Sequence, residues 1–97
     1  MSSFKKVIWW LIANSAGGNN RGLIIDSLFN KPKNTNELSK KLKLSYKTVQ
    51  YHLHILEKNE FVTSVGDKYG VTFFPSEKME QQKDYFYQVW NKTKKES

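Results

Sequence analysis

The sequence predicts a mainly α-helical fold of the α+β class, in which one β-hairpin stands among several helices. Apolar residues recur at helical spacing in separate stretches, and Gly, Asn and Pro divide these stretches from one another. After residue 60 the pattern changes to β-branched and aromatic residues on both sides of a Gly-containing turn. A chain of 97 residues is the size of one small domain, so residues 1–97 are predicted to form a single unit.

Two helices are predicted in the first third of the chain. The first spans residues 3–14 and is apolar on nearly all of its faces, because Trp9 and Trp10 lie off its main apolar stripe. A helix of this kind is buried on more than one side. Paired Gly and Asn residues interrupt it, and a second helix is predicted over residues 20–30. Pro32 then stops the helical pattern, since proline lacks the backbone N–H that a helix needs.

Residues 35–58 are predicted to form two helices joined by a tight turn. Asn34 and Glu37 make a capping box at the start of the first of these helices. Ser45 caps the second, which spans residues 45–58. The second helix has one apolar stripe, which consists of Val49, Leu53 and Leu56. This arrangement is typical of a helix-turn-helix.

A β-hairpin is predicted over residues 61–74, and a final helix over residues 76–92 with Ser76 as its cap. The order of helix, helix, helix-turn-helix, hairpin and helix is that of a winged helix-turn-helix. The predicted fold therefore has a two-stranded wing and additional helices at the N- and C-terminal ends.

The outward face of the helix over residues 45–58 carries no acid. At about 100° per residue, that face gathers cations, an amide, a phenol and an imidazole, from Lys47, Gln50, Tyr51, His54 and Lys58. Residues 31–47 hold six lysines against the single acid Glu37, and the whole chain has a net charge of +7. A basic surface with hydrogen-bonding side chains favours duplex DNA as the partner.

Each candidate contact has a chemical reason. Lys47 can reach a phosphate or a guanine edge, and the amide of Gln50 can pair with adenine. Lys68 and Tyr69 stand at the tip of the hairpin, where they can enter a minor groove, whereas Asp67 is expected to be a turn residue. The candidate DNA-binding residues are Lys33, Asn36, Ser45, Tyr46, Lys47, Thr48, Gln50, Tyr51, His54, Lys68 and Tyr69.

The chain is poor in the residues that enzymes and metal sites need. It has no Cys, no Gly-rich phosphate loop after a strand, and no recognisable grouping of nucleophile, base and orienting acid. His52 and His54 point about 200° apart on a helix, so they cannot share a metal ion. His52 lies beside the apolar stripe and is expected to be structural or to face a phosphate. We expect no enzyme activity, metal, cofactor or small-molecule substrate.

The terminal helices hold more aromatic surface than one small core needs. A two-fold dimer that packs the first and last helices would bury it and place two recognition helices about 34 Å apart, one turn of DNA. The alternative is that these residues complete the core of a monomer. The candidate dimer interface consists of Phe4, Ile8, Trp9, Trp10, Ile12, Met79, Phe86, Val89 and Trp90.

One run of residues resembles a known family. The pairs Thr48-Val49, His52-Leu53, Leu56-Glu57 and Phe61-Val62 are similar to those of the archaeal winged-helix regulators of the ArsR-like group, and the resemblance extends over about residues 18–75. It implies a homodimer that binds operator DNA and regulates transcription in the cytoplasm. The chain departs from the family at Tyr51, where relatives often carry Arg, and at Glu60, where Gly is common before the wing.

The sequence thus predicts a sequence-specific, dimeric DNA-binding transcription regulator, with residues 45–58 in the major groove and the wing near the minor groove. Two other interpretations remain open. A winged helix can also serve as a protein-interaction module in a transcription or viral assembly complex. The apolar residues 7–13 could instead hold a regulator at a membrane surface, although that run is too short to span a bilayer.

Overall fold

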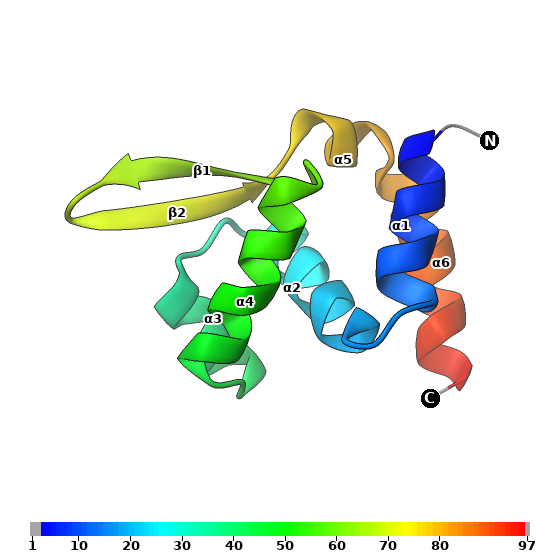
Figure 1. The fold of residues 1–97 in the computed structure, drawn as a ribbon, viewed down its shortest axis with the longest axis horizontal. Helices are drawn as coiled ribbons and strands as arrows, with labels where there is room; N and C mark the ends of the chain where they lie inside the picture. The colour runs from blue at the N-terminus through cyan, green and yellow to red at the C-terminus, as the bar shows by residue number, and fades with distance from the viewer. Residues whose placement is uncertain (1–2, 97) are drawn as a thin grey trace.

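The computed structural model describes residues 3–96 and has the winged helix-turn-helix architecture that the sequence predicts. Helices α1 and α6 lie side by side at one end, and the hairpin extends from the other end (Figure 1). Helix α2 lies between these two ends and contacts α1, α3, α4 and α6. The elements are α1 Ser3–Ala13, α2 Gly18–Asn30, α3 Thr35–Leu42, α4 Tyr46–Lys58, β1 Val62–Asp67, β2 Gly70–Pro75, α5 Glu77–Gln81 and α6 Lys83–Glu96.

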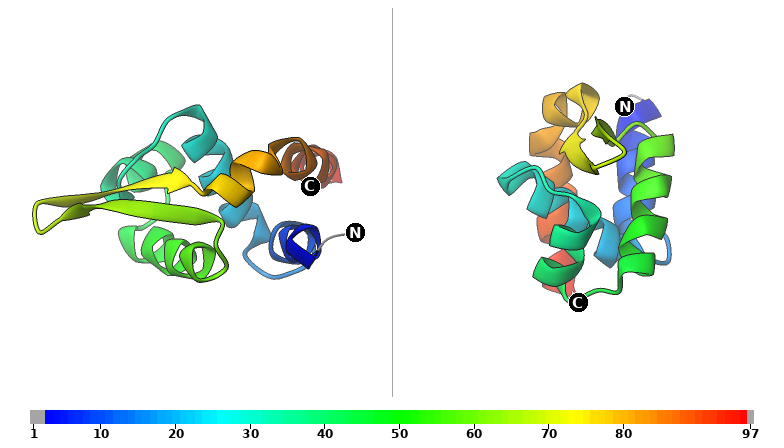
Figure 2. Two further views of the ribbon diagram at one scale, coloured as in Figure 1. Left: turned by 90° about the horizontal axis from the view of Figure 1, so that it is seen from above. Right: turned by 90° about the vertical axis from the view of Figure 1, so that its left-hand side faces the viewer.

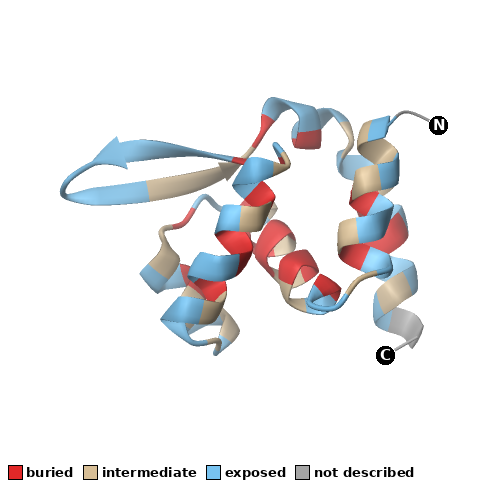
Figure 3. Ribbon diagram, in the orientation of Figure 1, coloured by how far each residue is buried: buried red, intermediate tan, exposed pale blue. Residues whose placement is uncertain are grey.

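The core is centred on α2, and the buried residues line the inner sides of the helices around it (Figure 3). Helix α2 approaches α6 closely at Gly22, where a Cβ atom would lie 2.2 Å from Cζ3 of Trp90. Trp90 is itself buried and stacks on Phe86, with their ring centroids 6.3 Å apart. Only a residue without a side chain fits at position 22 in this packing.

The helix-turn-helix has the caps that the sequence predicts. The backbone N–H of Glu37 donates to Asn34 Oδ1 at 2.7 Å, and the N–H of Asn34 donates to Glu37 Oε1 at 2.9 Å. At the start of α4, the N–H of Thr48 donates to Ser45 Oγ at 3.1 Å. Lys43 ends α3 in the left-handed region, with φ of 57°. The capping contacts define where α3 and α4 begin, because they satisfy backbone groups that helix ends leave unpaired.

The wing is an antiparallel hairpin whose register runs from Val62 opposite Pro75 to Asp67 opposite Gly70. Its two-residue tip consists of Lys68 and Tyr69, and Asp67 Oδ1 accepts a hydrogen bond from the Tyr69 N–H at 2.8 Å. The prediction that Asp67 is a turn residue is therefore confirmed. The views in Figure 2 show the hairpin projecting beyond the helices.

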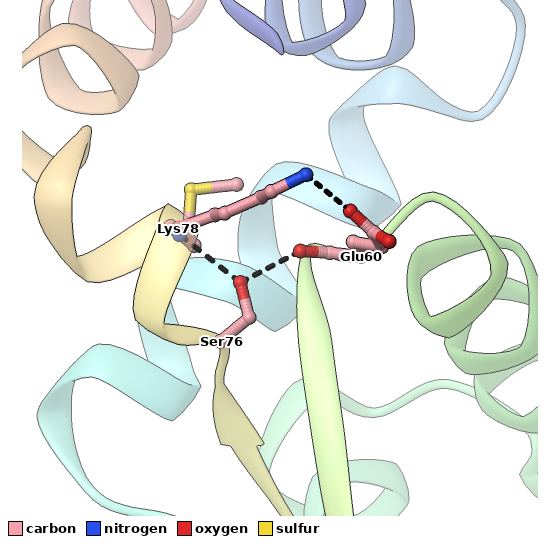
Figure 4. A network of polar contacts seen from close by, with 4 residues as sticks. Glu60, Ser76 and Lys78 are labelled. Atoms are coloured by element: carbon pink, nitrogen blue, oxygen red, sulfur yellow. Dashed lines mark hydrogen bonds and ion pairs between the residues drawn. The ribbon is translucent and has the colours of Figure 1, made fainter.

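A polar network joins the end of α4 to the start of α5 at the base of the wing (Figure 4). Ser76 Oγ donates to the Glu60 carbonyl at 2.6 Å and accepts from the Met79 N–H at 3.0 Å. Lys78 also forms an ion pair with the Glu60 carboxylate. Glu60 adopts a φ of 64°, in the left-handed region that glycine enters most easily, so the backbone here is one that would favour glycine.

The predicted final helix over residues 76–92 is wrong in one respect, because the structure divides it into α5 and α6. Gln82 ends α5, and its N–H donates to the carbonyl oxygens of Lys78 and Met79 at 3.2 and 3.1 Å. The break lets the chain change direction, so that Met79 enters the core while α6 runs beside α1 (Figure 1). Sequence periodicity does not reveal this change of direction, since both segments are helical.

The predicted dimer interface needs a correction. Because α1 and α6 pack against each other and against α2 within one chain, most of the candidate side chains are core residues and are not available to a partner. Trp9 and Trp10 are the exceptions, with 47% and 54% of their surface exposed. Phe4 is partly buried against Phe61, with ring centroids 5.3 Å apart. The candidates that the single chain buries are Ile8, Ile12, Met79, Phe86, Val89 and Trp90.

Candidate nucleic-acid interface

Helix α4 has one buried and one exposed side, as its sequence predicts. The apolar stripe packs into the core, and His52 is buried beside it. On the opposite side Lys47, Gln50, Tyr51 and His54 are all exposed. From Lys47 to His54 this side carries a lysine and hydrogen-bonding groups but no carboxylate, so it is chemically suited to a phosphate-bearing partner. Glu57, nearly one turn further along α4, is exposed as well.

A groove of about 550 Å³ lies between α4, the start of α3 and the wing. Residues from all three elements line it, so the fold brings together side chains that are far apart in the sequence. Six of the candidate DNA-binding residues line this groove, namely Asn36, Tyr46, Gln50, His54, Lys68 and Tyr69.

The other candidates on α4 occupy different positions. Lys47 and Tyr51 are exposed but do not line the groove. Ser45 and Thr48 are engaged with each other at the helix start, because Ser45 Oγ donates to Thr48 Oγ1 at 2.8 Å while accepting from the Thr48 backbone. The structure therefore gives this pair a capping role at the point where α4 begins.

Lys33 is not placed to contact DNA, and this prediction is wrong. Its side chain is only 8% exposed, and Nζ donates to the carbonyl oxygens of Ser27 at 2.8 Å and Lys31 at 2.9 Å. Burial, together with the nearby charges of Lys41 and Lys31, lowers the pKa of Lys33. Its backbone also pairs with Phe73 of the wing. Lys33 thus fastens the end of α2 to the wing, because its ammonium binds carbonyl groups at and just beyond the C-terminal end of that helix, where the helix dipole favours a cation.

The tip of the wing presents a cation and a phenol together. The Lys68 ammonium lies 5.2 Å from the centroid of the Tyr69 ring, and Tyr69 is 85% exposed. Tyr69 therefore does not pack back onto the hairpin. Both side chains are accessible from the groove that the wing shares with α4.

Two carboxylates on the groove wall lie outside the set that sequence reasoning singled out. Glu57 lines the groove from α4 and accepts a hydrogen bond from Ser64 Oγ at 2.8 Å, and Asp67 lines it from the wing. Glu57 follows Gln50 by seven residues, which returns it to within about 20° of the same helix direction. The prediction that the outward face of residues 45–58 carries no acid is therefore wrong at Glu57, as the seven-residue spacing could have shown. Only the folded hairpin brings Asp67 to the groove.

Residues 19–64 match a family model described as bacterial regulatory protein, arsR family. The matched segment contains the helix-turn-helix. That family consists of regulatory proteins and not of enzymes, in agreement with the prediction, and the ArsR-like part of the resemblance is supported. A comparison with curated proteins finds no match.

Solved structures share the winged helix-turn-helix fold at low sequence identity. HlyU from Vibrio cholerae N16961 is 23% identical with a TM-score of 0.67, and the match covers 91% of this chain and 94% of HlyU. A MarR family protein from Bacillus stearothermophilus is 21% identical with a TM-score of 0.66, over 97% of this chain and 66% of that protein. Overoxidized AbfR bound to DNA is 18% identical with a TM-score of 0.70, over 93% of this chain and 67% of AbfR.

The described residues also bear on whether the protein has a metal site or a membrane-spanning helix. Within residues 3–96, no group of three or more His, Asp or Glu side chains is placed to hold a metal ion. None of the helices in that range has the length and apolar character needed to cross a bilayer.

Proposed function

We propose that this protein is a sequence-specific duplex-DNA-binding transcription regulator, with α4 in the major groove and the wing near the adjacent minor groove. One observation carries the proposal: the exposed side of α4, with Lys47, Gln50 and His54, adjoins the groove that the wing closes on its other side. An α-helix fits the major groove of B-DNA, and a hairpin beside it can follow the neighbouring backbone.

The proposed contacts divide into positioning and reading roles. Lys47 and Lys68 neutralise phosphates, because ammonium groups are strong but unselective partners of the backbone. Gln50 reads a base edge, since its amide can donate and accept at the same time. Further hydrogen bonds to phosphates or bases come from Asn36, Tyr46, Tyr51, His54 and Tyr69. Ser45 and Thr48 hold the first turn of α4 at the DNA backbone.

The similarities described above support this proposal independently of the surface chemistry. The matched family model describes regulatory proteins, and AbfR, whose fold is similar, has been solved bound to DNA. The absence of Cys is compatible with a protein that works at DNA in a reducing cytoplasm, where we place it. The archaeal grouping stays a prediction from the sequence.

Selection of bound sequences from a random duplex pool tests the proposal directly. The expected result is an enriched motif whose binding weakens steeply as salt concentration rises, because bound lysines release counterions from the phosphates. Absence of salt-sensitive binding to any duplex at low ionic strength would refute the proposal. Tight binding to another protein together with weak DNA binding would favour the interaction-module alternative.

We further propose a homodimer in which Trp9 and Trp10 contact the second copy. Two neighbouring indoles on α1 are about half exposed, and burying them offers a stabilisation that the single chain does not obtain. The solution mass of the protein and of a W9S/W10S variant tests this, with A13S on the same exposed side of α1 as the control. A dimer that persists in the double variant would contradict the proposal. A liposome flotation assay tests the membrane-surface alternative, which would be favoured if the wild-type protein floats with the liposomes.

A further inference from the structure

A buried cation lies directly beneath the recognition helix. Arg21 of α2 is only 3% exposed, and its guanidinium is held by the end of α1 and by the segment that connects α1 to α2. Nε donates to the Leu11 carbonyl at 2.9 Å, and Nη2 donates to Ser15 Oγ at 2.6 Å and to the Ala16 carbonyl at 2.9 Å. Within residues 3–96 no acidic side chain is paired with this guanidinium. Its charge is compensated by carbonyl and hydroxyl oxygens.

The fourth polar contact of Arg21 is with the recognition helix itself. Nη1 lies 3.4 Å from Nδ1 of His52, which is 5% exposed. A guanidinium can only donate hydrogen bonds, so Nδ1 must be the acceptor and the imidazole must be neutral, with its proton on Nε2. The contact therefore exists in only one protonation state of His52.

The surrounding backbone leaves little room for these two side chains to move apart. Gly17 adopts a φ of +84°, and a Cβ atom at this position would lie 2.8 Å from His52 Cε1 and 2.9 Å from Arg21 Nη1. The connecting segment thus presses against both groups. A change in the contact between Arg21 and His52 must be accommodated by movement of α4 or of this segment.

The charged and titratable neighbours of His52 are few. From α2 it faces Arg21, and on its own helix it adjoins Tyr51, whose ring centroid is 5.1 Å away. Elements α3 and β1 also pack against α4, but no titratable side chain that the structure describes on them interacts with His52. Burial lowers the pKa of His52, and the Arg21 charge lowers it further.

We infer that His52 is a positioning residue that makes DNA binding sensitive to acid: as a neutral acceptor it holds α4 against Arg21, and its protonation releases α4. The inference rests on the proposed function of α4. Protonation places a proton on Nδ1, which removes the acceptor and sets two cations against each other at a separation of 3.4 Å. Tyr51 and Gln50, which precede His52 on the helix, then lose their fixed position.

The direction of the pH effect follows from the lowered pKa. His52 is neutral near pH 7, and as the pH falls below its ordinary value of 6.5 the unfolded chain takes up the proton before the folded chain does. The stabilising contact is therefore present above pH 6.5 and is lost as the pH falls through the lower folded-state pKa. His54, the second histidine of the chain, is exposed on the DNA side, so the DNA measurements below also use variants that lack it.

Titration of the two imidazole Cε1–H resonances in the full-length wild-type protein tests the first step without DNA. The expected result is a midpoint for His52 that lies below its ordinary value of 6.5. A midpoint for His52 at or above 6.5 would overturn the inference. This measurement needs no variant, so it does not depend on whether a substitution at position 52 folds.

The second step is measured as DNA affinity between about pH 8 and pH 5.5 at constant ionic strength, by fluorescence anisotropy with one labelled duplex. The H54Q variant keeps His52 as its one histidine. Its DNA affinity should fall as the pH is lowered, by about tenfold for each unit by which the pKa of His52 differs between the free and the DNA-bound protein. The H52Q/H54Q variant should show no such loss, since glutamine keeps an acceptor oxygen that does not titrate.

The outcomes separate the two proposals. If wild-type protein binds no duplex even at pH 7.5, the proposed function fails. If it binds at that pH but H54Q and H52Q/H54Q have the same pH profile, DNA recognition stands and the role of His52 is overturned. Should H52Q/H54Q not fold, the decision rests on H54Q: a fall in affinity that coincides with the His52 resonance midpoint supports the inference, and a pH-independent affinity contradicts it.

Discussion

Substitution of Gly22 by alanine tests the packing on which the fold depends. The added Cβ would lie 2.2 Å from Cζ3, 2.3 Å from Cε3 and 2.8 Å from Cη2 of Trp90, so the indole ring must move. It is buried and stacked on Phe86, and overpacking of such a site costs about 3 kcal/mol. Alanine recovers about 1 kcal/mol through its higher helix propensity. The expected net loss is about 2 kcal/mol, or a Tm lower by about 10 °C.

Urea unfolding followed by far-ultraviolet circular dichroism measures this loss. The matched control is G70A, because a Cβ at Gly70 meets no atom within 4 Å, and its free energy of unfolding should change little by comparison. In a W90F background the G22A substitution should cost less, since phenylalanine lacks the larger indole that meets the new methyl group. An unchanged or increased stability of G22A would refute the packing argument, and an equal cost in both backgrounds would show that Trp90 is not its source.

Four other substitutions probe the helix-turn-helix and the segment that precedes it. K43G should raise the free energy of unfolding by about 1 kcal/mol in urea titrations, because Lys43 holds a φ of 57° that glycine adopts without strain; a lower stability would contradict this. K47A should weaken binding to all duplexes alike and reduce the salt slope by about one unit, whereas an unchanged slope would remove Lys47 from the phosphate contacts. Q50A should relax preference at one base position at a cost of about 1–3 kcal/mol in competition assays, and an unaltered motif would exclude Gln50 as a reader. K33M should lower stability while leaving the salt slope unchanged, since the Lys33 ammonium binds carbonyl groups inside the protein; a reduced slope would return it to the DNA surface.

The local features of this protein were predictable because their causes are local. Asn34 and Glu37 are three residues apart and close a capping box through their own side chains, and Ser45 caps α4 in the same way. Asp67 accepts from the backbone two residues later at the tip of the wing. The division of α4 into a buried and an exposed side follows from the helical repeat alone. These interactions need no knowledge of what the rest of the chain packs against.

The exposed or buried state of individual side chains required the tertiary structure. Lys33 belongs to a lysine-rich segment, but its ammonium is buried because it binds the carbonyl groups of Ser27 and Lys31 at the end of α2. The sequence makes Trp90 an interface candidate, whereas the structure buries it in the space that Gly22, far away in sequence, leaves open. The bend at Gln82 likewise arises because α6 packs along α1.

The same distinction applies to the candidate interface. Residue type and spacing along the chain are enough to predict the polar side of α4 and the hairpin that accompanies it. The packing of the elements, by contrast, sets which of those side chains share a groove and brings Arg21 of α2 against His52 of the recognition helix. Contacts between residues 31 positions apart depend on how the helices pack, which residue periodicity does not specify.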